Sequence, residues 1–190
     1  MTTLKTFAAL AFAAVSGTSF AVPETYDIDP THTLPRFEYN HMGFTTQQSR
    51  FDKISGQITL DREAKTGAVN IVIDARSVDT GIAQLNEHIQ SKGMFDTATY
   101  PSITFTSNDF TFHGDSVTSI QGALTINGVT KPVVLAVQSF KCMPHPRLKK
   151  DACGAVATTV IKRSAFNAGE FVPMVSDEVQ LTIPVEAIKQ

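Results

Sequence analysis

The stretch IQGALTINGVTKPVVLAV, residues 120–137, shows the pattern on which the fold prediction depends. Apolar side chains alternate with polar or small ones on both sides of Asn127-Gly128, namely Ile120, Leu124 and Ile126 before it and Val133, Leu135 and Val137 after it. A period of two is typical of half-buried strands, and Asn-Gly between two such strands favours a tight turn. The stretch therefore predicts an antiparallel β-hairpin.

The same period-two pattern covers most of the remaining chain. It recurs at residues 37–41, 56–61, 69–74, 103–106, 110–112, 156–161 and 179–185. The one helical pattern runs from Ile82 to Lys92, ahead of Gly93. About eight strands can form a sandwich or a closed barrel. The continuous antiparallel run favours a barrel, because closure leaves no sheet edge and about eight strands leave room for one ligand.

The N-terminal segment predicts export. Residues 1–21 carry one early lysine, Lys5, then an apolar run from Phe7 to Val15, and then small residues that end at Ala21. This arrangement is typical of a cleaved signal peptide, and the run is too short for a membrane anchor of about 20 apolar residues. We therefore expect a signal peptide at 1–21, one domain at 22–190, and secretion to the periplasm.

Charge and length restrict the partners of the exported part. Residues 22–190 carry 15 basic and 18 acidic side chains, and these charges are scattered along the sequence. This balance argues against nucleic acid and against anionic membrane surfaces as partners. No later segment is apolar for long enough to cross a bilayer, so we expect no stable membrane insertion.

The two cysteines, Cys142 and Cys153, favour a disulfide bond. An even count in an exported chain is typical of disulfide pairing. A zinc site would need further ligands at close spacing, and a redox motif would need a tighter Cys-x-x-Cys. We therefore predict a structural disulfide.

Seven segments, in order along the chain, resemble the YceI-like family of periplasmic, lipocalin-like, polyisoprenoid-binding proteins. They are YDIDPTHT (26–33), DARSVDTG (74–81), EHI (87–89), MFD (94–96), YPSITFTS (100–107), GALTINGVTKPV (122–133) and IKRSAF (161–166). The sequence departs from the family at Leu85-Asn86, where an Arg-Asp pair is usual, and at Ala165 and Asn167, where Asp and Gly are usual. These departures concern the polar residues expected at the rim of the ligand cavity more than they concern the fold.

The resemblance implies an all-β fold, an eight-stranded antiparallel lipocalin-like barrel with one or two short helices. It also implies a deep cavity for an isoprenoid or fatty chain, and a homodimer. We accordingly expect a periplasmic carrier of a polyprenyl, quinone-type or fatty lipid. Neither a separate cofactor nor a metal is expected.

A cavity for a prenyl tail must be apolar, because the ligand offers only methyl and methylene groups to the surrounding side chains. The chain has 13 Phe and no Trp, which suits a flat lining that needs no hydrogen bonds. The predicted ligand-binding residues are Phe37, His41, Phe51, Ile58, Ile71, His88, Phe95, Ile103, Phe105, Leu124, Ile126, Phe166, Phe171 and Met174. Since each buried methylene contributes about 0.8 kcal/mol, affinity should increase with tail length.

Three histidines and two arginines have alternative roles. His32 is expected to stabilise the turn after Asp29-Pro30, whereas neutral His41 and His88 could donate to a quinone carbonyl or another head group. The histidine spacings typical of metal sites do not occur. Arg76 and Arg163 are expected in ion pairs, with Asp74, Asp79 and Glu87 as candidate partners.

Two other functional classes make different predictions. A periplasmic hydrolase acting on a lipid or ester through His32 and His41 would need a nucleophile, a base and an oxyanion site. The sequence has no Gly-x-Ser-x-Gly elbow, so we expect no catalytic residues. A surface adhesin or structural module would have a filled core and no bound lipid.

Overall fold

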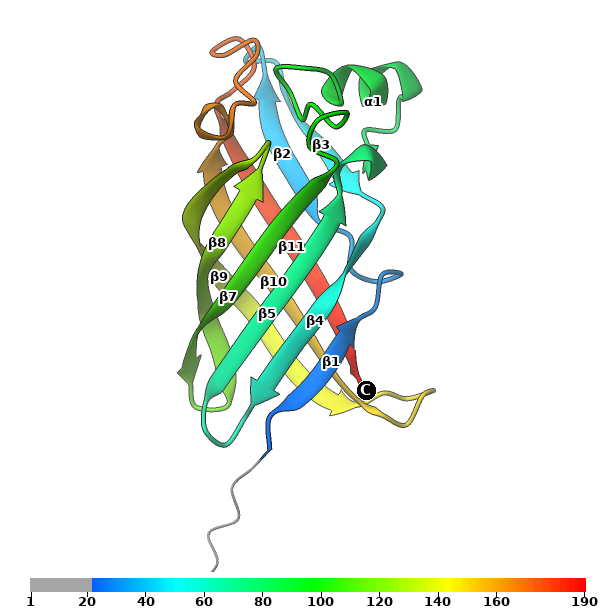
Figure 1. Cartoon of the computed structure of the whole chain (residues 1–190), viewed down its shortest axis with the longest axis vertical. Coiled ribbons are helices and arrows are strands. Elements are labelled where there is room, and N and C mark those ends of the chain that lie inside the picture. The colour runs from blue at the N-terminus through cyan, green and yellow to red at the C-terminus, as the bar shows by residue number, and fades with distance from the viewer. Residues whose placement is uncertain (1–21) are drawn as a thin grey trace, which may run out of the picture.

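The computed structural model describes residues 22–190, and eleven strands of this part form one sheet that closes into a barrel (Figure 1). The strands are β1 (Glu24–Ile28), β2 (Arg36–His41), β3 (Thr45–Phe51), β4 (Ile54–Asp61), β5 (Thr66–Asp74), β6 (Val78–Asp79), β7 (Ser102–His113), β8 (Ser116–Ile126), β9 (Val129–Pro144), β10 (Asp151–Lys162) and β11 (Glu178–Lys189). One α-helix, α1 (Ala83–Ile89), and two 3₁₀ turns, Ala75–Ser77 and Arg163–Phe166, complete the secondary structure. The predicted signal peptide lies outside the described residues.

The predicted eight-stranded antiparallel barrel is confirmed. The strand order is β1-β4-β5-β7-β8-β9-β10-β11-β2-β3-β6, and a further pairing of β1 with β11 closes the sheet. Strand β11 pairs with β1 near its C-terminal end and with β2 nearer its N-terminal end. Strands β1 and β2 thus occupy one position in the barrel, β3 and β4 the next, and β5 and β6 the third, which with β7 to β11 makes eight positions in all.

The predicted hairpin around Asn127-Gly128 joins β8 to β9. Both residues have positive φ, 50° for Asn127 and 71° for Gly128, as a tight type I′ hairpin turn requires. The Asn127 side chain is buried and donates a hydrogen bond to the Met94 carbonyl at 2.6 Å. The turn is therefore tied to the segment that follows α1.

Strand β7 differs from the expectation of two short apolar segments. It is one twelve-residue strand, and its pairing with β8 shifts register between Thr106 and Asp109. Such a bulge changes which face of the barrel the following residues occupy. Because of it, Phe105 and Phe110 both line the interior although they are an odd number of residues apart.

The helix is shorter than predicted and lies over one end of the barrel, drawn uppermost in Figure 1. Ile82 is extended and precedes the helix, and Gln90 ends it. The carbonyl oxygen of the Asn86 side chain accepts hydrogen bonds from the backbone and hydroxyl of Thr80, which holds the turn before the helix. Among residues 22–190, no helix is long and apolar enough to cross a bilayer.

The upper end also carries the β2–β3 hairpin, the β8–β9 turn and the loop at residues 167–177 that leads into β11 (Figure 1). The lower end carries the β4–β5 and β7–β8 turns, the loop between β9 and β10, and the C-terminus. Buried apolar side chains form two clusters, one around Phe37 and Phe166 and the other around Tyr26 and Leu60. Side chains of both clusters line the interior of the barrel.

Candidate functional site

A cavity of about 440 Å³ occupies the interior of the barrel. It extends from Tyr26 and Val117 at the lower end to His88 and Phe171 at the upper end, and most of its lining side chains are hydrophobic. Its volume is typical of small-molecule sites, which span about 300–1,000 Å³. Ile120 lines the cavity and is only partly buried. The filled core expected of a structural module is not found.

Thirteen of the fourteen ligand-binding residues predicted from the sequence line this cavity. They come from β2, β3, β4, β5, β7 and β8, from α1, and from the segments that follow α1 and β10. They are Phe37, His41, Phe51, Ile58, Ile71, His88, Phe95, Ile103, Phe105, Leu124, Ile126, Phe166 and Phe171. Their contact with a ligand stays a prediction, since the structure gives their positions alone.

Met174 is the exception, and its prediction as a lining residue is corrected. Its side chain is 57% exposed and does not line the cavity. Met174 lies in the irregular loop before β11, where the alternation of strand residues does not apply. Spacing from neighbouring apolar residues therefore says nothing about which way its side chain points.

The cavity has further lining residues that were not selected from the sequence, among them Leu85, Phe110, Leu135 and Ile183. Leu135 and Ile183 alternate within β9 and β11, so their period-two spacing contained the signal. Leu85 shares the helical spacing of Ile89, and its apolar side chain lines the cavity from α1. Phe110 could be placed only with the register shift in β7.

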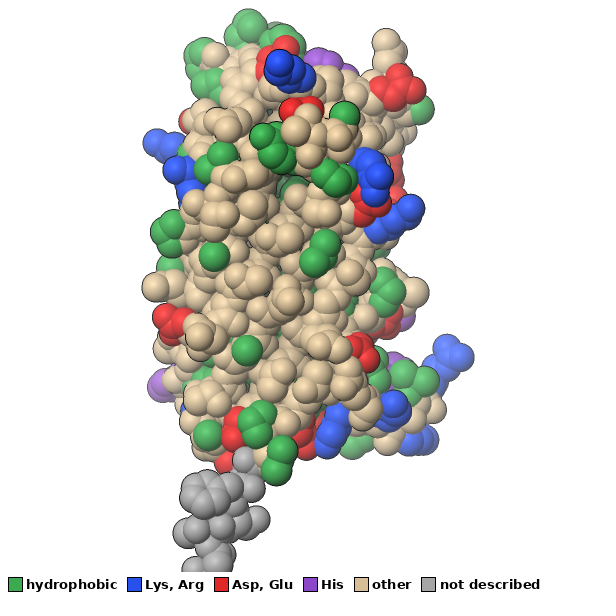
Figure 2. All heavy atoms as spheres, in the orientation of Figure 1, with side chains coloured by type: hydrophobic (Ala, Val, Ile, Leu, Met, Phe, Trp, Pro, Cys, Tyr) green, Lys and Arg blue, Asp and Glu red, His purple; other side chains and the backbone are tan. Residues whose placement is uncertain are grey.

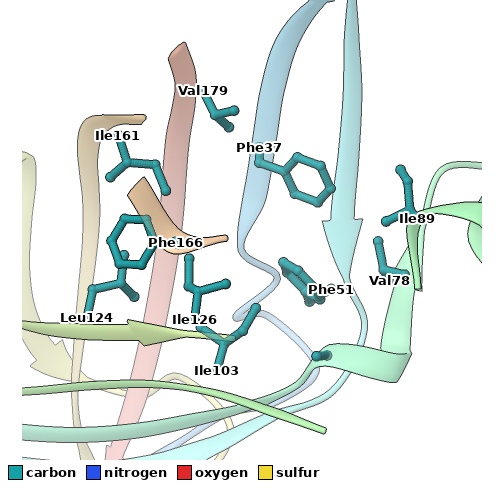
Figure 3. Close-up of a cluster of buried hydrophobic side chains, with 11 residues drawn as sticks. Phe37, Phe51, Val78, Ile89, Ile103, Leu124, Ile126, Ile161, Phe166 and Val179 are labelled. Atoms are coloured by element: carbon teal, nitrogen blue, oxygen red, sulfur yellow. The ribbon is translucent and has the colours of Figure 1, made fainter. Parts of the chain in front are cut away.

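Three phenylalanines pack against one another in the upper half of the cavity. The ring centroids of Phe37 and Phe51 are 5.5 Å apart, and Phe95 lies 5.8 Å from Phe37 and 5.4 Å from Phe51. Figure 3 shows Phe37 and Phe51 on β2 and β3 facing the same interior as Leu124 on β8. Edge contacts between aromatic rings add to the stabilisation from burial. The three rings thus fasten the segment after α1 to the barrel and leave an apolar surface toward the cavity.

Polar side chains of the cavity concentrate near its upper end. His41 ends β2, where its backbone bridges to Val175, and His88 lies on α1 with its ring centroid 5.6 Å from that of Phe171. Tyr39 is half-buried in the same region, and burial raises the pKa of its phenol, so it is neutral. Imidazole and phenol groups at this end could donate or accept hydrogen bonds with a head group.

Arg163 organises the loop beside this end. Its guanidinium is buried and donates to four backbone carbonyls, those of Ser176 at 2.8 Å, Glu170 at 2.8 Å, Val175 at 2.9 Å and Ala168. Burial lowers the pKa of Arg163. One side chain therefore holds the backbone of most of the 167–177 loop.

The ion-pair prediction for the two arginines is half right. Arg76 pairs with Asp74, with Nε 2.9 Å from the carboxylate, but on the exposed surface. Arg163 bonds to none of the predicted acids, because carbonyls of its own loop surround it. Sequence spacing cannot reveal backbone acceptors of this kind.

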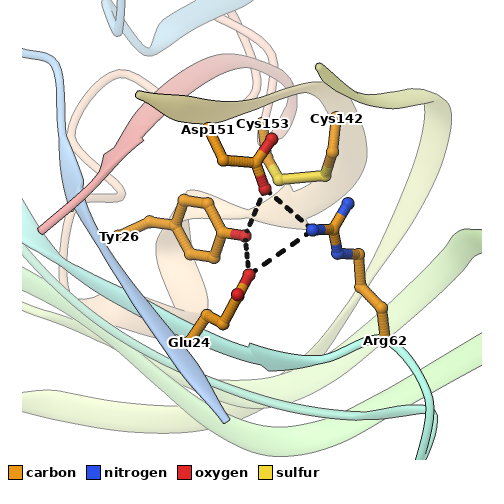
Figure 4. The surroundings of a disulfide bond; sticks show 6 residues. All are labelled: Glu24, Tyr26, Arg62, Cys142, Asp151 and Cys153. Atoms are coloured by element: carbon orange, nitrogen blue, oxygen red, sulfur yellow. Dashed lines mark hydrogen bonds and ion pairs between the residues drawn. A yellow bond between two sulfur atoms is a disulfide. The ribbon is translucent and has the colours of Figure 1, made fainter. Parts of the chain in front are cut away.

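Charged residues meet around Tyr26 at the lower end (Figure 4). The Tyr26 hydroxyl lies 2.8 Å from the Glu24 carboxylate and 2.9 Å from that of Asp151, and it donates to this pair. Arg62 contacts both carboxylates, and Lys189 contacts Glu24. Burial and the two carboxylates raise the pKa of Tyr26 far above its usual value, so the phenol is neutral. Its polar atom is thus already engaged and is not available to a ligand.

The predicted disulfide between Cys142 and Cys153 is confirmed and lies beside this lower cluster. The two cysteines are directly opposite in the β9–β10 pair, with Cα atoms 4.0 Å apart. Cys153 is buried and lines the lower part of the cavity. The bond therefore holds two adjacent strands together where the cavity ends.

His32 stabilises the turn after β1, as predicted. Its Nδ1 lies 2.7 Å from the Asp29 carboxylate and 4.0 Å from that of Glu186, and this hydrogen bond to Asp29 raises the pKa of His32. The three residues form the one group of three potential metal ligands found among residues 22–190. His32 does not line the cavity, whereas His41 does. The structure therefore does not bring together the pair on which the hydrolase alternative depends.

Comparisons with known proteins agree with this architecture. A family model described as the YceI-like domain matches residues 26–187. Protein YceI of Escherichia coli O157:H7 is 36% identical over 186 residues, covering 97% of this chain and 95% of the relative. The crystal structure of BcnA from Burkholderia cenocepacia has a TM-score of 0.72 and 26% identity, covering 84% of this chain and 98% of that one.

A second solved structure shares the fold alone. It is a polyisoprenoid binding domain from Saccharophagus degradans, implicated in plant cell wall breakdown. Its TM-score is 0.66 at 21% identity, with 87% of this chain and 98% of that chain covered. Both solved structures thus match most of the barrel.

Proposed function

Because the chain belongs to the YceI-like family, we propose that it is a binding protein that carries a long-chain isoprenoid, of polyprenyl or quinone type, or a fatty lipid. The apolar cavity of about 440 Å³ inside the barrel is the observation that carries this proposal. The isoprenoid binding ascribed to the Saccharophagus degradans domain supports the same class of ligand. Burial of tail methylenes, at about 0.8 kcal/mol each, supplies most of the affinity.

The ligand enters tail first, with its head group at the upper end. Tyr39, His41 and His88 offer polar atoms there, whereas the lower part is lined by side chains such as Leu60 and Val117. A polar head group at the lower end would lose its hydration without finding a free partner, which costs free energy. Polar head groups are therefore bound near the rim.

The carrier functions in the periplasm after removal of residues 1–21, and residues 22–190 are its single domain. The disulfide between Cys142 and Cys153 supports this location, because such bonds persist in oxidising compartments. Binding, not catalysis, is the activity of the barrel, since the cavity presents a long apolar lining with few polar groups.

The proposal is tested by extracting natively purified protein with organic solvent and analysing the extract by mass spectrometry. We expect a long-tailed apolar molecule in an amount comparable with the protein. A mock purification from cells without the protein provides the control for free lipid. Undenatured protein with an empty extract, and with no affinity for added long-chain amphiphiles, would contradict the carrier function.

A further inference from the structure

Exposed hydrophobic side chains lie together at the upper end of the barrel. Five of them, from two segments, expose between 38% and 82% of their surface. They are Met42, Phe44, Phe171, Val172 and Met174, and they are called the mouth patch below. Figure 2 shows hydrophobic side chains gathered at this end, where Figure 1 places the loop that precedes β11, while those on the visible side of the barrel are more scattered.

The two segments of the mouth patch form one surface. The backbone N–H of Met42 donates to the Met174 carbonyl at 2.8 Å, and His41 bridges to Val175. Phe171 in turn contacts His88 of α1. The tips of the β2–β3 hairpin and of the 167–177 loop are therefore held side by side.

Neither segment contains Asp, Glu, Lys or Arg. Residues 41–49 read HMGFTTQQS, and residues 171–176 read FVPMVS. The nearest such residues along the chain are Glu38 and Arg50 for the first segment and Glu170 and Asp177 for the second, three acids and one base. Loop tips that lack Asp, Glu, Lys and Arg and carry large apolar side chains suit burial at the surface of a bilayer. Flanking acids give no attraction to anionic lipid head groups.

The mouth patch is continuous with the cavity. Met42 and Phe171 are both exposed and both line the cavity. At the lower end the lining residues Tyr26, Leu60 and Val117 are all buried. The apolar interior thus meets the surface at the mouth patch, where a hydrocarbon tail could move between bilayer and cavity with little exposure to water.

We propose that the mouth patch docks on the surface of a neutral phospholipid bilayer and so directs the cavity toward the lipid. This inference rests on the carrier function proposed above. A second copy of the chain bound to the same patch would cover the opening through which a carried lipid must pass. A bilayer is therefore the partner that is consistent with both the mouth patch and the open cavity beneath it.

The test compares two double variants for binding to phosphatidylcholine vesicles by flotation. Phe44→Ser with Met174→Ser removes two patch side chains that do not line the cavity. Val134→Ser with Leu148→Ser removes two similarly exposed apolar side chains, on β9 and at the lower end. We expect the first variant to weaken vesicle binding at least about tenfold. The second variant should bind vesicles like the unmodified protein.

Affinity for a soluble long-chain amphiphile is measured on the same proteins and should be unchanged in both variants. Equal vesicle binding by the Phe44 and Met174 variant would overturn the docking proposal. A dimer of the unmodified protein that these substitutions dissociate, measured by light scattering, would also overturn it. Vesicle binding that requires added phosphatidylglycerol would overturn it as well. Protein that retains an extractable lipid but ignores vesicles refutes docking and leaves the carrier function intact. Protein that binds vesicles through the patch but holds no lipid refutes the carrier function and leaves docking intact.

Discussion

Ala157 offers a direct way to shorten the cavity. It is buried on β10, lines the cavity, and pairs in register with Val137 and Ile183, which also line it. Replacing Ala157 by Phe places six additional ring carbons in space that a tail would otherwise occupy. If the ring displaces roughly three to six methylenes at about 0.8 kcal/mol each, binding weakens by about 2 to 5 kcal/mol, or about 30-fold to 5,000-fold.

The assay is competition by straight-chain alcohols of increasing length against a fluorescent apolar probe, with thermal unfolding measured in parallel. The loss should be largest for the longest alcohol, and the melting temperature should not fall, because the ring fills empty space. Val160→Phe is the matched control, since Val160 lies on the same strand with 55% of its surface exposed. Full affinity of folded Ala157→Phe for the longest alcohol, or an equal loss in Val160→Phe, would refute the assignment of the tail to this cavity.

Three further predictions concern stability. Replacing Cys142 and Cys153 by serine should lower the free energy of unfolding by about 3 kcal/mol and the melting temperature by about 6–12 °C; an unchanged melting temperature would contradict this. Arg163→Met leaves four backbone carbonyls without their donor and should cost about 3 kcal/mol or more in denaturant unfolding, so a loss near zero would show that the loop holds without it. The hydrogen bond to Asp29 raises the pKa of His32 from 6.5, so its contribution is complete below that pH and is lost as pH rises through the raised value. The melting-temperature difference between the unmodified protein and His32→Ala should therefore shrink from about pH 5.5 to about pH 9, and a difference that grows with pH would contradict the assignment.

Most strands and their inward faces followed from the sequence, although not β1 and β3, because a period of two is a local property of extended chain. Leu124 and Ile126 on one side of a hairpin turn could be assigned to one face without knowing any distant contact. The disulfide was also predictable from the sequence, because two cysteines allow only one pairing within the chain. Predicted lining residues on strands, such as Ile58, Ile71 and Leu124, were found in this way.

Other features depended on contacts between distant segments. The bulge in β7 reverses the face of Phe110, and the loop around Arg163 supplies carbonyl partners that no spacing reveals. Met174 was misplaced because a loop has no fixed side-chain period. His32 faces Glu186 across the sheet, outside the cavity.

The sequence by itself determined that this chain forms alternating antiparallel strands with one apolar face, because alternation and turn residues act locally. Only the tertiary structure decided that the apolar faces enclose open space. The pairing of Tyr26 with Lys189 closes the sheet between the two ends of the domain, and that closure sets how far apart opposite strands lie. Whether side chains meet across the barrel or leave a cavity depends on this diameter, which no local pattern contains.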